Sequence, residues 1–193
     1  MIKVENLSML FSTEEVQTKA LNEVTFEIEK GEFVAIMGPS GCGKSTLLNI
    51  LGTLDTPTSG SYLFEGKRVD KMNENQLTAL RKGNIGFIFQ SFNLIANVTV
   101  GKNIEFALKA GGYPKSQWSD RIHELLKLVG LESKIDSYSS SLSGGQKQRV
   151  SIARALVRNP PVILADEPPA RWTPIPAARC WGFCSSCTSR DTP

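Results

Sequence analysis

The sequence predicts an α/β protein with a separate antiparallel layer before its main sheet. Apolar and polar residues roughly alternate over 2–11 and 24–28, which indicates two strands with one covered face. Continuous apolar runs at 33–37 and 162–165 are typical of strands buried on both faces of a parallel sheet. Segments with helical periodicity lie between these runs, and strands that alternate with helices belong to the α/β class.

Periodicity places the remaining elements. Strands are expected over 60–64 and 85–89, and a helix is expected from Lys44. Between 100 and 145 the apolar residues recur at three- and four-residue spacing, which predicts a helical insertion. The inward-facing residues are Ile104, Leu108, Ile122, Leu125, Leu126 and Val129 in this insertion, and Val150, Ala153 and Leu156 in a last helix over 146–158.

The composition is that of an ordinary globular chain. The 193 residues are 40% hydrophobic and 21% charged, which is enough for one buried core. A net charge of +3 gives no reason to expect nucleic acid as a partner. No apolar run approaches the roughly 20 residues of a membrane span, and the N-terminus lacks the apolar stretch of a secretory signal. We therefore expect a cytoplasmic protein that reaches a membrane only through a partner.

A glycine-rich loop follows the first buried strand. Residues 38–45 read Gly-Pro-Ser-Gly-Cys-Gly-Lys-Ser, the spacing of a phosphate-binding loop, and a helix is expected next. The backbone N–H groups of such a loop converge on phosphate oxygens. Lys44 is expected to contact the β- and γ-phosphates of ATP, and the Ser45 hydroxyl to bind Mg²⁺. The alternative is a glycine-rich turn without a ligand. The expected nucleotide-binding residues are Gly38, Ser40, Gly41, Cys42, Gly43, Lys44, Ser45 and Thr46.

Two carboxylates follow the second apolar run. Asp166 and Glu167 come at the carboxyl end of a predicted parallel strand, where open α/β sheets bind ligands. Asp166 suits Mg²⁺, and Glu167 is placed to polarise the water that attacks the γ-phosphate. Alone, such a pair would be an ordinary solvated strand end. Together with the phosphate loop, it predicts a site of ATP hydrolysis.

A second glycine-rich turn indicates the family. Residues 142–146 read Leu-Ser-Gly-Gly-Gln and open the last helix, so they form a second potential anion site. With the phosphate loop, Gln90, Asp166 and Glu167, this string resembles the signature of ATP-binding cassette (ABC) ATPases over residues 1–168. The resemblance implies a P-loop NTPase (RecA-like) core with an N-terminal antiparallel β-layer and an α-helical signature subdomain.

The resemblance also implies a dimer. In this family two subunits pack head to tail, so that the signature string of one subunit closes over the ATP held by the other. Here the closing residues would be Ser143, Gly144, Gly145 and Gln146, over the nucleotide bound at Lys44. The family's further partner is an integral-membrane permease, which places the subunit on the cytoplasmic face of the membrane.

Two more residues match positions that the family uses. Phe11 falls where these ATPases carry an aromatic side chain that stacks on adenine; the alternative is a buried strand phenylalanine. Gln90 falls in the loop between core and helical insertion, where the family's glutamine approaches Mg²⁺ and the attacking water. By resemblance, Lys44, Gln90 and Glu167 are catalytic residues, and Ser45, Gln90 and Asp166 are metal ligands.

The finer resemblance and the domain division follow from the same motifs. Segments 18–21 and 85–94 look most like the lipoprotein-releasing and macrolide-export branch. One departure is the run Tyr-Ser-Ser-Ser at 138–141, where many relatives have a proline. The core is expected at 1–90 and 146–168, and the helical subdomain at 91–145.

Residues 169–193 do not continue the family pattern. After Pro168 the family has Thr-Gly-Ala-Leu-Asp or a similar loop, and later a switch histidine. The only histidine here, His123, is expected at the surface of the helical insertion. The C-terminal part of the core is therefore expected to be missing.

The genetic code suggests an origin for this tail. The codons CCG-GCG-CGC-TGG-AC can encode residues 169–173, and in a shifted frame they contain Gly-Ala-Leu-Asp. The codons required at 180–184 likewise hide an apolar, leucine-containing segment. A frameshifted, disordered tail is the preferred interpretation, and a genuine divergent tail is the second. A Zn²⁺ site on Cys180, Cys184 and Cys187 is the third, since three thiols without a nearby histidine are too few ligands.

These observations predict the ATP-binding and hydrolysing subunit of an ABC transporter, which powers export or extraction by a separate permease. One alternative is a truncated product that binds nucleotide without catalysis. Another is an ABC ATPase that acts on nucleic acid or the ribosome. Such proteins usually carry two fused cassettes or a long coiled-coil insertion, for which the stretch between Gln90 and Leu142 has no room.

Overall fold

The computed structural model describes residues 1–12, 17–166 and 181–184. Its strands are β1 (Ile2–Ser12), β2 (Gln17–Ile28), β3 (Val34–Ala35), β4 (Ser59–Phe64), β5 (Lys67–Arg68), β6 (Ile85–Ile88), β7 (Val162–Ala165) and β8 (Trp181–Cys184). Its α-helices are α1 (Lys44–Leu51), α2 (Glu74–Asn84), α3 (Val100–Ala110), α4 (Trp118–Leu128) and α5 (Gly144–Ala155). Short 3-10 turns lie at Val69–Lys71, Lys115–Gln117, Glu132–Lys134 and Ser139–Ser141.

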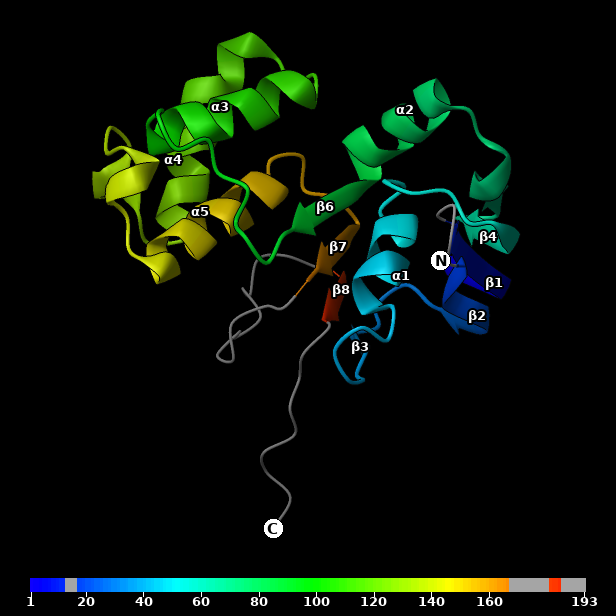
Figure 1. The fold of residues 1–193 in the computed structure, drawn as a ribbon. Helices are drawn as coiled ribbons and strands as arrows, with labels where there is room; N and C mark the ends of the chain where they lie inside the picture. Colours follow the sequence, from blue (N-terminus) through cyan, green and yellow to red (C-terminus); the bar gives the residue numbers. More distant parts are fainter. Residues whose placement is uncertain (13–16, 167–180, 185–193) are drawn as a thin grey trace.

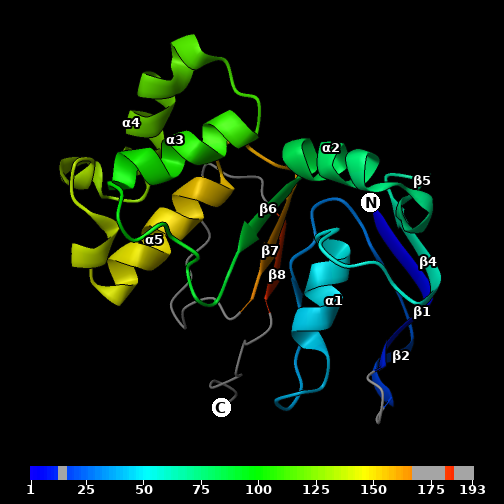
Figure 2. The same ribbon diagram turned by 45° about the horizontal axis from the view of Figure 1, so that its top comes forward.

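The strands form two sheets that differ in direction. The first is antiparallel, with the order β2-β1-β4-β5, and the second is parallel, with the order β3-β8-β7-β6. The antiparallel sheet and the helices α3, α4 and α5 lie on opposite sides of the parallel sheet and α1 (Figures 1 and 2). The predicted α/β core with an antiparallel layer before it is confirmed.

Strand β7 is buried along its whole length and joins two hydrophobic cores. Val162 and Leu164 pack with α1 and the antiparallel sheet, whereas Ile163 and Ala165 pack with α3, α4 and α5. Successive side chains of a strand point to opposite faces, so four apolar residues in a row serve both cores. The prediction of a strand buried on both faces is confirmed here.

The expectation for 33–37 is wrong, because only one face of this segment is covered. Val34 and Ile36 pack on the core beside α1, while Phe33 is 59% exposed and Met37 is 65% exposed. The regular strand is only two residues long, and it lies at the edge of the described sheet. An edge strand with a core on one face leaves its alternate side chains in contact with solvent.

The helical insertion forms α3 and α4, and its predicted inward residues are all buried. The last predicted helix begins two residues earlier than expected, at Gly144. Ser143 and Gln146 form a capping box there, in which each side chain accepts a hydrogen bond from the backbone N–H of the other residue. His123 is exposed, as predicted, and its Nδ1 lies 2.8 Å from the carbonyl oxygen of Ser119.

Helix α2 is absent from the sequence-based expectation. It buries only Leu77, so it gives almost no apolar periodicity. Its start is nevertheless encoded locally, because Asn73 and Gln76 form a second capping box. That box is the signal from which the helix could have been found.

The structure differs from the expectation at residues 181–184, which lie in the segment predicted to be a disordered tail. They form β8, which pairs in parallel with both β3 and β7. The pairing uses backbone N–H and C=O groups, so it depends little on which side chains the strand carries. Between β3 and β7, an extended segment of any sequence satisfies two rows of backbone groups.

The double burial of β7 gives a testable consequence for stability. Leu164 is 0% exposed, so Leu164→Ala is expected to lower the free energy of unfolding by about 2–5 kcal/mol through lost contacts and a cavity. Urea unfolding followed by circular dichroism measures this change. Leu128→Ala, at an exposed position of α4, is the matched control and should cost less than about 1 kcal/mol. Equal losses in the two variants would contradict a core organised around β7.

Candidate functional site

The glycine-rich loop lies between β3 and α1 and wraps around the Lys44 side chain. Lys44 Nζ donates hydrogen bonds to the carbonyl oxygens of Gly38 at 2.9 Å and Pro39 at 2.8 Å, and it lies 3.6 Å from Cys42 Sγ. The carbonyl oxygens that accept these hydrogen bonds carry no formal charge, so they form no ion pair with the Lys44 ammonium group. The loop therefore presents a cation at the N-terminus of a helix, which is where phosphate binds.

Gly43 fixes the turn from the loop into α1. It adopts a left-handed conformation with φ +88°, and a Cβ at this position would overlap the carbonyl oxygen of Ala20. Glycine is therefore required for both conformation and space. Gly43 thus allows the phosphate loop to pack closely against Ala20 of β2.

Ser45, in the first turn of α1, and Asp166, directly after β7, contact each other. Ser45 Oγ donates a hydrogen bond of 3.1 Å to Asp166 Oδ1. Asp166 comes directly after β7, and its N–H bonds to the carbonyl oxygen of Ile88 at the end of β6. Two oxygen ligands from positions far apart in the sequence thus converge beside Lys44. Oxygen ligands of this kind suit Mg²⁺.

These residues line one cavity of about 560 Å³, a volume suited to a small-molecule ligand. Gln90 lines it as well, shortly after the end of β6. The complete lining is Thr18, Lys19, Ala20, Gly38, Ser40, Gly41, Gly43, Lys44, Ser45, Thr46, Gln90 and Asp166. The structure therefore brings together most of the phosphate-loop residues, Gln90 and Asp166, which sequence reasoning assigned to nucleotide and metal.

Two predicted nucleotide contacts do not line this cavity. Cys42 is exposed, with its sulfur beside Lys44. Phe11 is 46% exposed on β1, so the alternative of a buried strand phenylalanine is wrong. Phe11 pairs across the strands with Thr18, which does line the cavity. An exposed aromatic ring beside the cavity remains consistent with base stacking.

Sequence reasoning did not assign Thr18, Lys19 and Ala20 to the site. They lie on β2, and only the folding of the antiparallel sheet against the phosphate loop places them in the cavity. No motif marks them. The one available signal is Gly43, whose lack of a side chain leaves room for Ala20.

The signature string lies apart from the cavity, at the start of α5. Ser143 is the N-cap of this helix, and Gly144 and Gly145 have open space where a Cβ would lie. None of Ser143, Gly144, Gly145 and Gln146 lines the Lys44 cavity. The string is thus an exposed helix N-terminus that the subunit's own cavity does not use. Glu167 lies outside the described residues.

The comparisons with known proteins agree with this geometry. A sequence model of the ABC transporter family matches residues 21–170.

The chain belongs to the ABC transporter family.

It is an ATP-binding subunit of the ABC ATPase type. An ABC transporter ATP-binding protein of Methanocaldococcus jannaschii, MJ1508, is 48% identical over 168 residues, which cover 87% of this chain and 75% of that protein. The macrolide export ATP-binding/permease protein MacB of Hahella chejuensis is 47% identical over 168 residues, and the match spans only 26% of that longer protein. The predicted resemblance to the macrolide-export branch is confirmed.

The fold of the ATP-binding subunit also matches a solved structure. The ATP-binding cassette MJ0796, in a dimeric post-hydrolysis state bound to ADP and Pi, superposes with a TM-score of 0.85 and 36% sequence identity, covering 96% of this chain and 88% of that one. The predicted P-loop NTPase fold is therefore confirmed. In the part of the subunit that the structure describes, no helix has the length and apolar character to cross a bilayer.

The crowding at Gly43 gives a test of the nucleotide site. Gly43→Ala is expected to lower the affinity for a fluorescent ATP analogue by at least about tenfold, because the new Cβ would displace the phosphate loop from β2. Fluorescence titration measures this affinity. Gly66→Ala is the matched control, because Gly66 also has a left-handed conformation but has open space around it. The affinity of Gly66→Ala for the ATP analogue should equal that of the unaltered subunit. A similar loss of affinity in Gly43→Ala and Gly66→Ala would contradict a specific role for the close packing of Gly43 against Ala20.

Proposed function

We propose that the subunit binds Mg-ATP in the Lys44 cavity and hydrolyses it as part of a head-to-tail dimer. This dimer would drive export or extraction by a separate membrane permease. The observation that carries the proposal is the hydrogen bond between Ser45 and Asp166, which joins the phosphate loop to the end of β7 beside Lys44. A helix N-terminus, a cation and two oxygen ligands in one cavity suit a nucleotide triphosphate.

The residues at this bond fit a magnesium ion. Ser45 Oγ and Asp166 Oδ1 are hard oxygen ligands, and Gln90 from the end of β6 adds a third oxygen to the same cavity. Bound there with ATP, Mg²⁺ would offset charge on the β- and γ-phosphate oxygens. Because Mg²⁺ keeps several waters, a small set of protein ligands is sufficient.

The phosphate loop supplies the second positive charge. Lys44 would exchange the carbonyl oxygens of Gly38 and Pro39 for the β- and γ-phosphates when ATP enters. Glu167, one residue beyond Asp166, would hold and polarise the attacking water, and Gln90 would help to orient that water. Lys44, Gln90 and Glu167 are thus the proposed catalytic residues.

The position of the signature string favours a dimer. Ser143 and Gly145 lie at an exposed helix N-terminus outside the subunit's own cavity. A second subunit facing the first would bring this helix end to the γ-phosphate of the first subunit's ATP. The similar cassette MJ0796 was solved as a dimer. Phe11 would stack on the adenine at the open side of the cavity.

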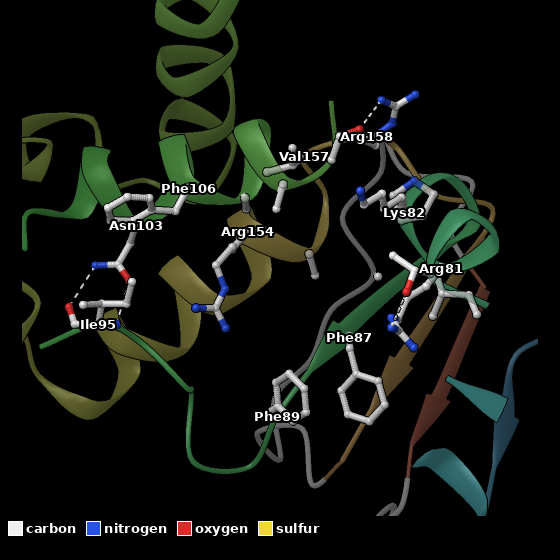
Figure 3. A pocket seen from close by; sticks show the side chains of 18 residues that line it. Arg81, Lys82, Phe87, Phe89, Ile95, Asn103, Phe106, Arg154, Val157 and Arg158 are labelled. Carbon is white, nitrogen blue, oxygen red and sulfur yellow. Dashed lines mark hydrogen bonds between the residues drawn. The ribbon is translucent and has the colours of Figure 1, made fainter. Parts of the chain in front are cut away.

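A groove on another face is the proposed docking surface for the permease. It has a volume of about 510 Å³ and lies between α2 and β6 on one side and α3 and α5 on the other (Figure 3). Phe87 and Phe89 stack within it, with ring centroids 4.3 Å apart. Phe87 and Phe89 are partly buried, and aromatic side chains in a groove are typical of a protein interface. Because Gln90 directly follows Phe89, docking would act on the ATP cavity through β6.

The groove is also positively charged. Its cationic side chains are Arg81, Lys82, Arg154 and Arg158, and its described lining includes no Asp or Glu. Burial lowers the pKa of the Arg154 guanidinium from its ordinary value, and this group bonds to carbonyl oxygens of the loop after Gln90. A permease segment that carries carboxylates would complement this surface. The dimer would then sit on the cytoplasmic face of the membrane, with no nucleic acid involved.

We further propose that residues 169–193 derive from a shifted reading frame of an intact ATPase gene. The family match ends at residue 170. Phe33 and Met37, which flank β3, are exposed, and the apolar, leucine-containing segment encoded in the other frame would supply a cover for these side chains. The core would then be 1–90 and 146–168, and the helical subdomain 91–145.

ATP turnover tests the catalytic proposal. The purified subunit is expected to release phosphate from ATP in the presence of Mg²⁺, and to stop when Mg²⁺ is chelated. Glu167→Gln should reduce the rate by roughly 10²–10⁴-fold while ATP still binds, because only the water-activating group is lost. Lys44→Ala should lose both ATP hydrolysis and ATP binding. If the unaltered subunit releases phosphate no faster than Glu167→Gln does, the chain is instead a truncated, non-catalytic product.

The reading-frame proposal has a direct test. DNA sequencing across the codon of Pro168, in several independent isolates of the gene, is expected to reveal one additional base relative to the frame that gives this chain. The restored frame should encode Gly-Ala-Leu-Asp shortly afterwards, and later a histidine after an apolar strand. Mass spectrometry of the native protein is the independent measurement. Recovery of peptides from 169–193 would contradict the proposal.

A further inference from the structure

Two buried polar side chains lie between the loop that follows Gln90 and the signature string. Asn103 on α3 and Ser139 before α5 are each 1% exposed. Asn103 Oδ1 accepts a hydrogen bond of 2.9 Å from the N–H of Ile95. Its Nδ2 lies 3.1 Å from the carbonyl oxygens of Ile95 and Thr99 and 2.9 Å from Ser139 Oγ. Figure 3 shows the Asn103 amide beside Ile95. This one amide therefore ties the end of the loop, the start of α3 and the segment before α5 together.

Ser139 completes the network from the other side. Its hydroxyl accepts from Asn103 and lies 2.7 Å and 2.8 Å from the carbonyl oxygens of Ile95 and Val98, which share its one proton. Its backbone N–H also donates to Val98 at 3.2 Å. A proline at this position would have neither the hydroxyl nor the N–H. Within the serine run before the signature string, Ser139 is thus the residue that makes the connection.

Backbone hydrogen bonds extend the same contact. The N–H of Val100 bonds to the carbonyl oxygen of Ser137 at 2.9 Å, and the N–H of Gly101 bonds to that of Ile135 at 2.8 Å. A Cβ at Gly101 would lie 3.0 Å from Ile135, so the two segments are in tight contact. The residues from 95 to 101 and from 135 to 139 therefore form one unit.

This unit connects the two functional loops of the subunit. Gln90 of the ATP cavity precedes Ile95 by a few residues, and Arg154 of α5 bonds to carbonyl oxygens of Phe92 and Asn93 in between. On the other side, buried Leu142 leads directly from Ser139 to Ser143. A network of buried side chains that are all hydrogen-bonded is rigid, since breaking one bond leaves its buried partner unpaired.

We infer that Asn103 and Ser139 are positioning residues that fix the signature string to the loop after Gln90. The position of Gln90, which depends on the nucleotide in its own cavity, then determines the position of Ser143 in the same subunit. Ser143 in turn contacts the ATP bound by the partner subunit. The inference rests on the proposed head-to-tail dimer. It assigns these two residues to the assembly step and leaves nucleotide binding within one subunit to the phosphate loop.

The test separates dimerisation from nucleotide binding in the full chain. Dimerisation is measured by sedimentation with Mg²⁺ and a non-hydrolysable ATP analogue, and affinity is measured by titrating dilute monomer with a fluorescent ATP analogue. Ser139→Ala and Asn103→Leu are expected to weaken the dimer by at least about tenfold, while changing the monomer's nucleotide affinity by less than about twofold. The double variant should be no weaker than the more severe single variant, because both changes break one network. Ser140→Ala, at the exposed neighbouring serine, is the matched control and should dimerise normally.

Each outcome has a separate meaning. If the unaltered chain dimerises on nucleotide and Ser139→Ala and Asn103→Leu do so equally well, the positioning role is wrong and the proposed dimer stands. If nucleotide affinity falls in parallel with dimerisation, the residues are merely structural and the inference also fails. If the unaltered chain binds nucleotide without dimerising, the proposed assembly fails and this inference fails with it. If Asn103→Leu does not fold, Ser139→Ala, which removes a single oxygen atom, decides the outcome.

Discussion

The structure depends on the double burial of β7. Its four residues alternate between two cores, so this one strand holds the helical part and the antiparallel layer on opposite sides of the same sheet. A strand enclosed in this way cannot shift its register by one residue without exchanging its two sets of side chains. The position of Asp166 is thereby fixed, because it directly follows the strand. The geometry of the ATP site is thus a consequence of packing.

The phosphate loop shows how a charged group is held ready for a ligand. Lys44 donates to backbone carbonyl oxygens of its own loop, and Ser45 bonds to Asp166. Lys44, Ser45 and Asp166 are the residues proposed to bind ATP and a cation. Because each of them bonds within the subunit in the absence of a ligand, none of these contacts leaves its polar atoms without a partner. In the proposed ATP complex, exchange of these carbonyl oxygens for phosphate oxygens would strengthen the interaction of Lys44, because hydrogen bonds between ionised groups are stronger than those to neutral ones. The loop thus holds the Lys44 side chain in place through neutral carbonyl groups, and the loop itself contains no carboxylate that would offset the charge of Lys44.

The helical part combines an apolar core with a polar connection. Apolar residues of α3, α4 and α5 supply most of the burial, whereas Asn103 and Ser139 determine how the loops at its edge are joined. Apolar packing tolerates small displacements better than a saturated hydrogen-bond network does, since hydrogen bonds weaken steeply with angle and distance. The groove on the core side is lined by Ile95 and Asn103 as well. A partner in that groove would therefore contact the connection itself.

The sequence by itself determined the chemistry of this ABC subunit, because each reactive group lies in a short motif whose local structure is encoded beside it. The phosphate loop and Asp166 were assigned from spacing and position, Gln90 and the role of the signature string from the family resemblance, and most helices and the buried β7 from periodicity. Only the tertiary structure placed Thr18, Lys19 and Ala20 in the cavity, exposed Phe33 and Met37, and joined Asn103 to Ser139. These relations depend on which distant segments pack together, and no local pattern records that. Helix α2 and β8 were missed for a related reason, since a helix with one buried residue and a strand held by backbone pairing leave little trace in side-chain periodicity.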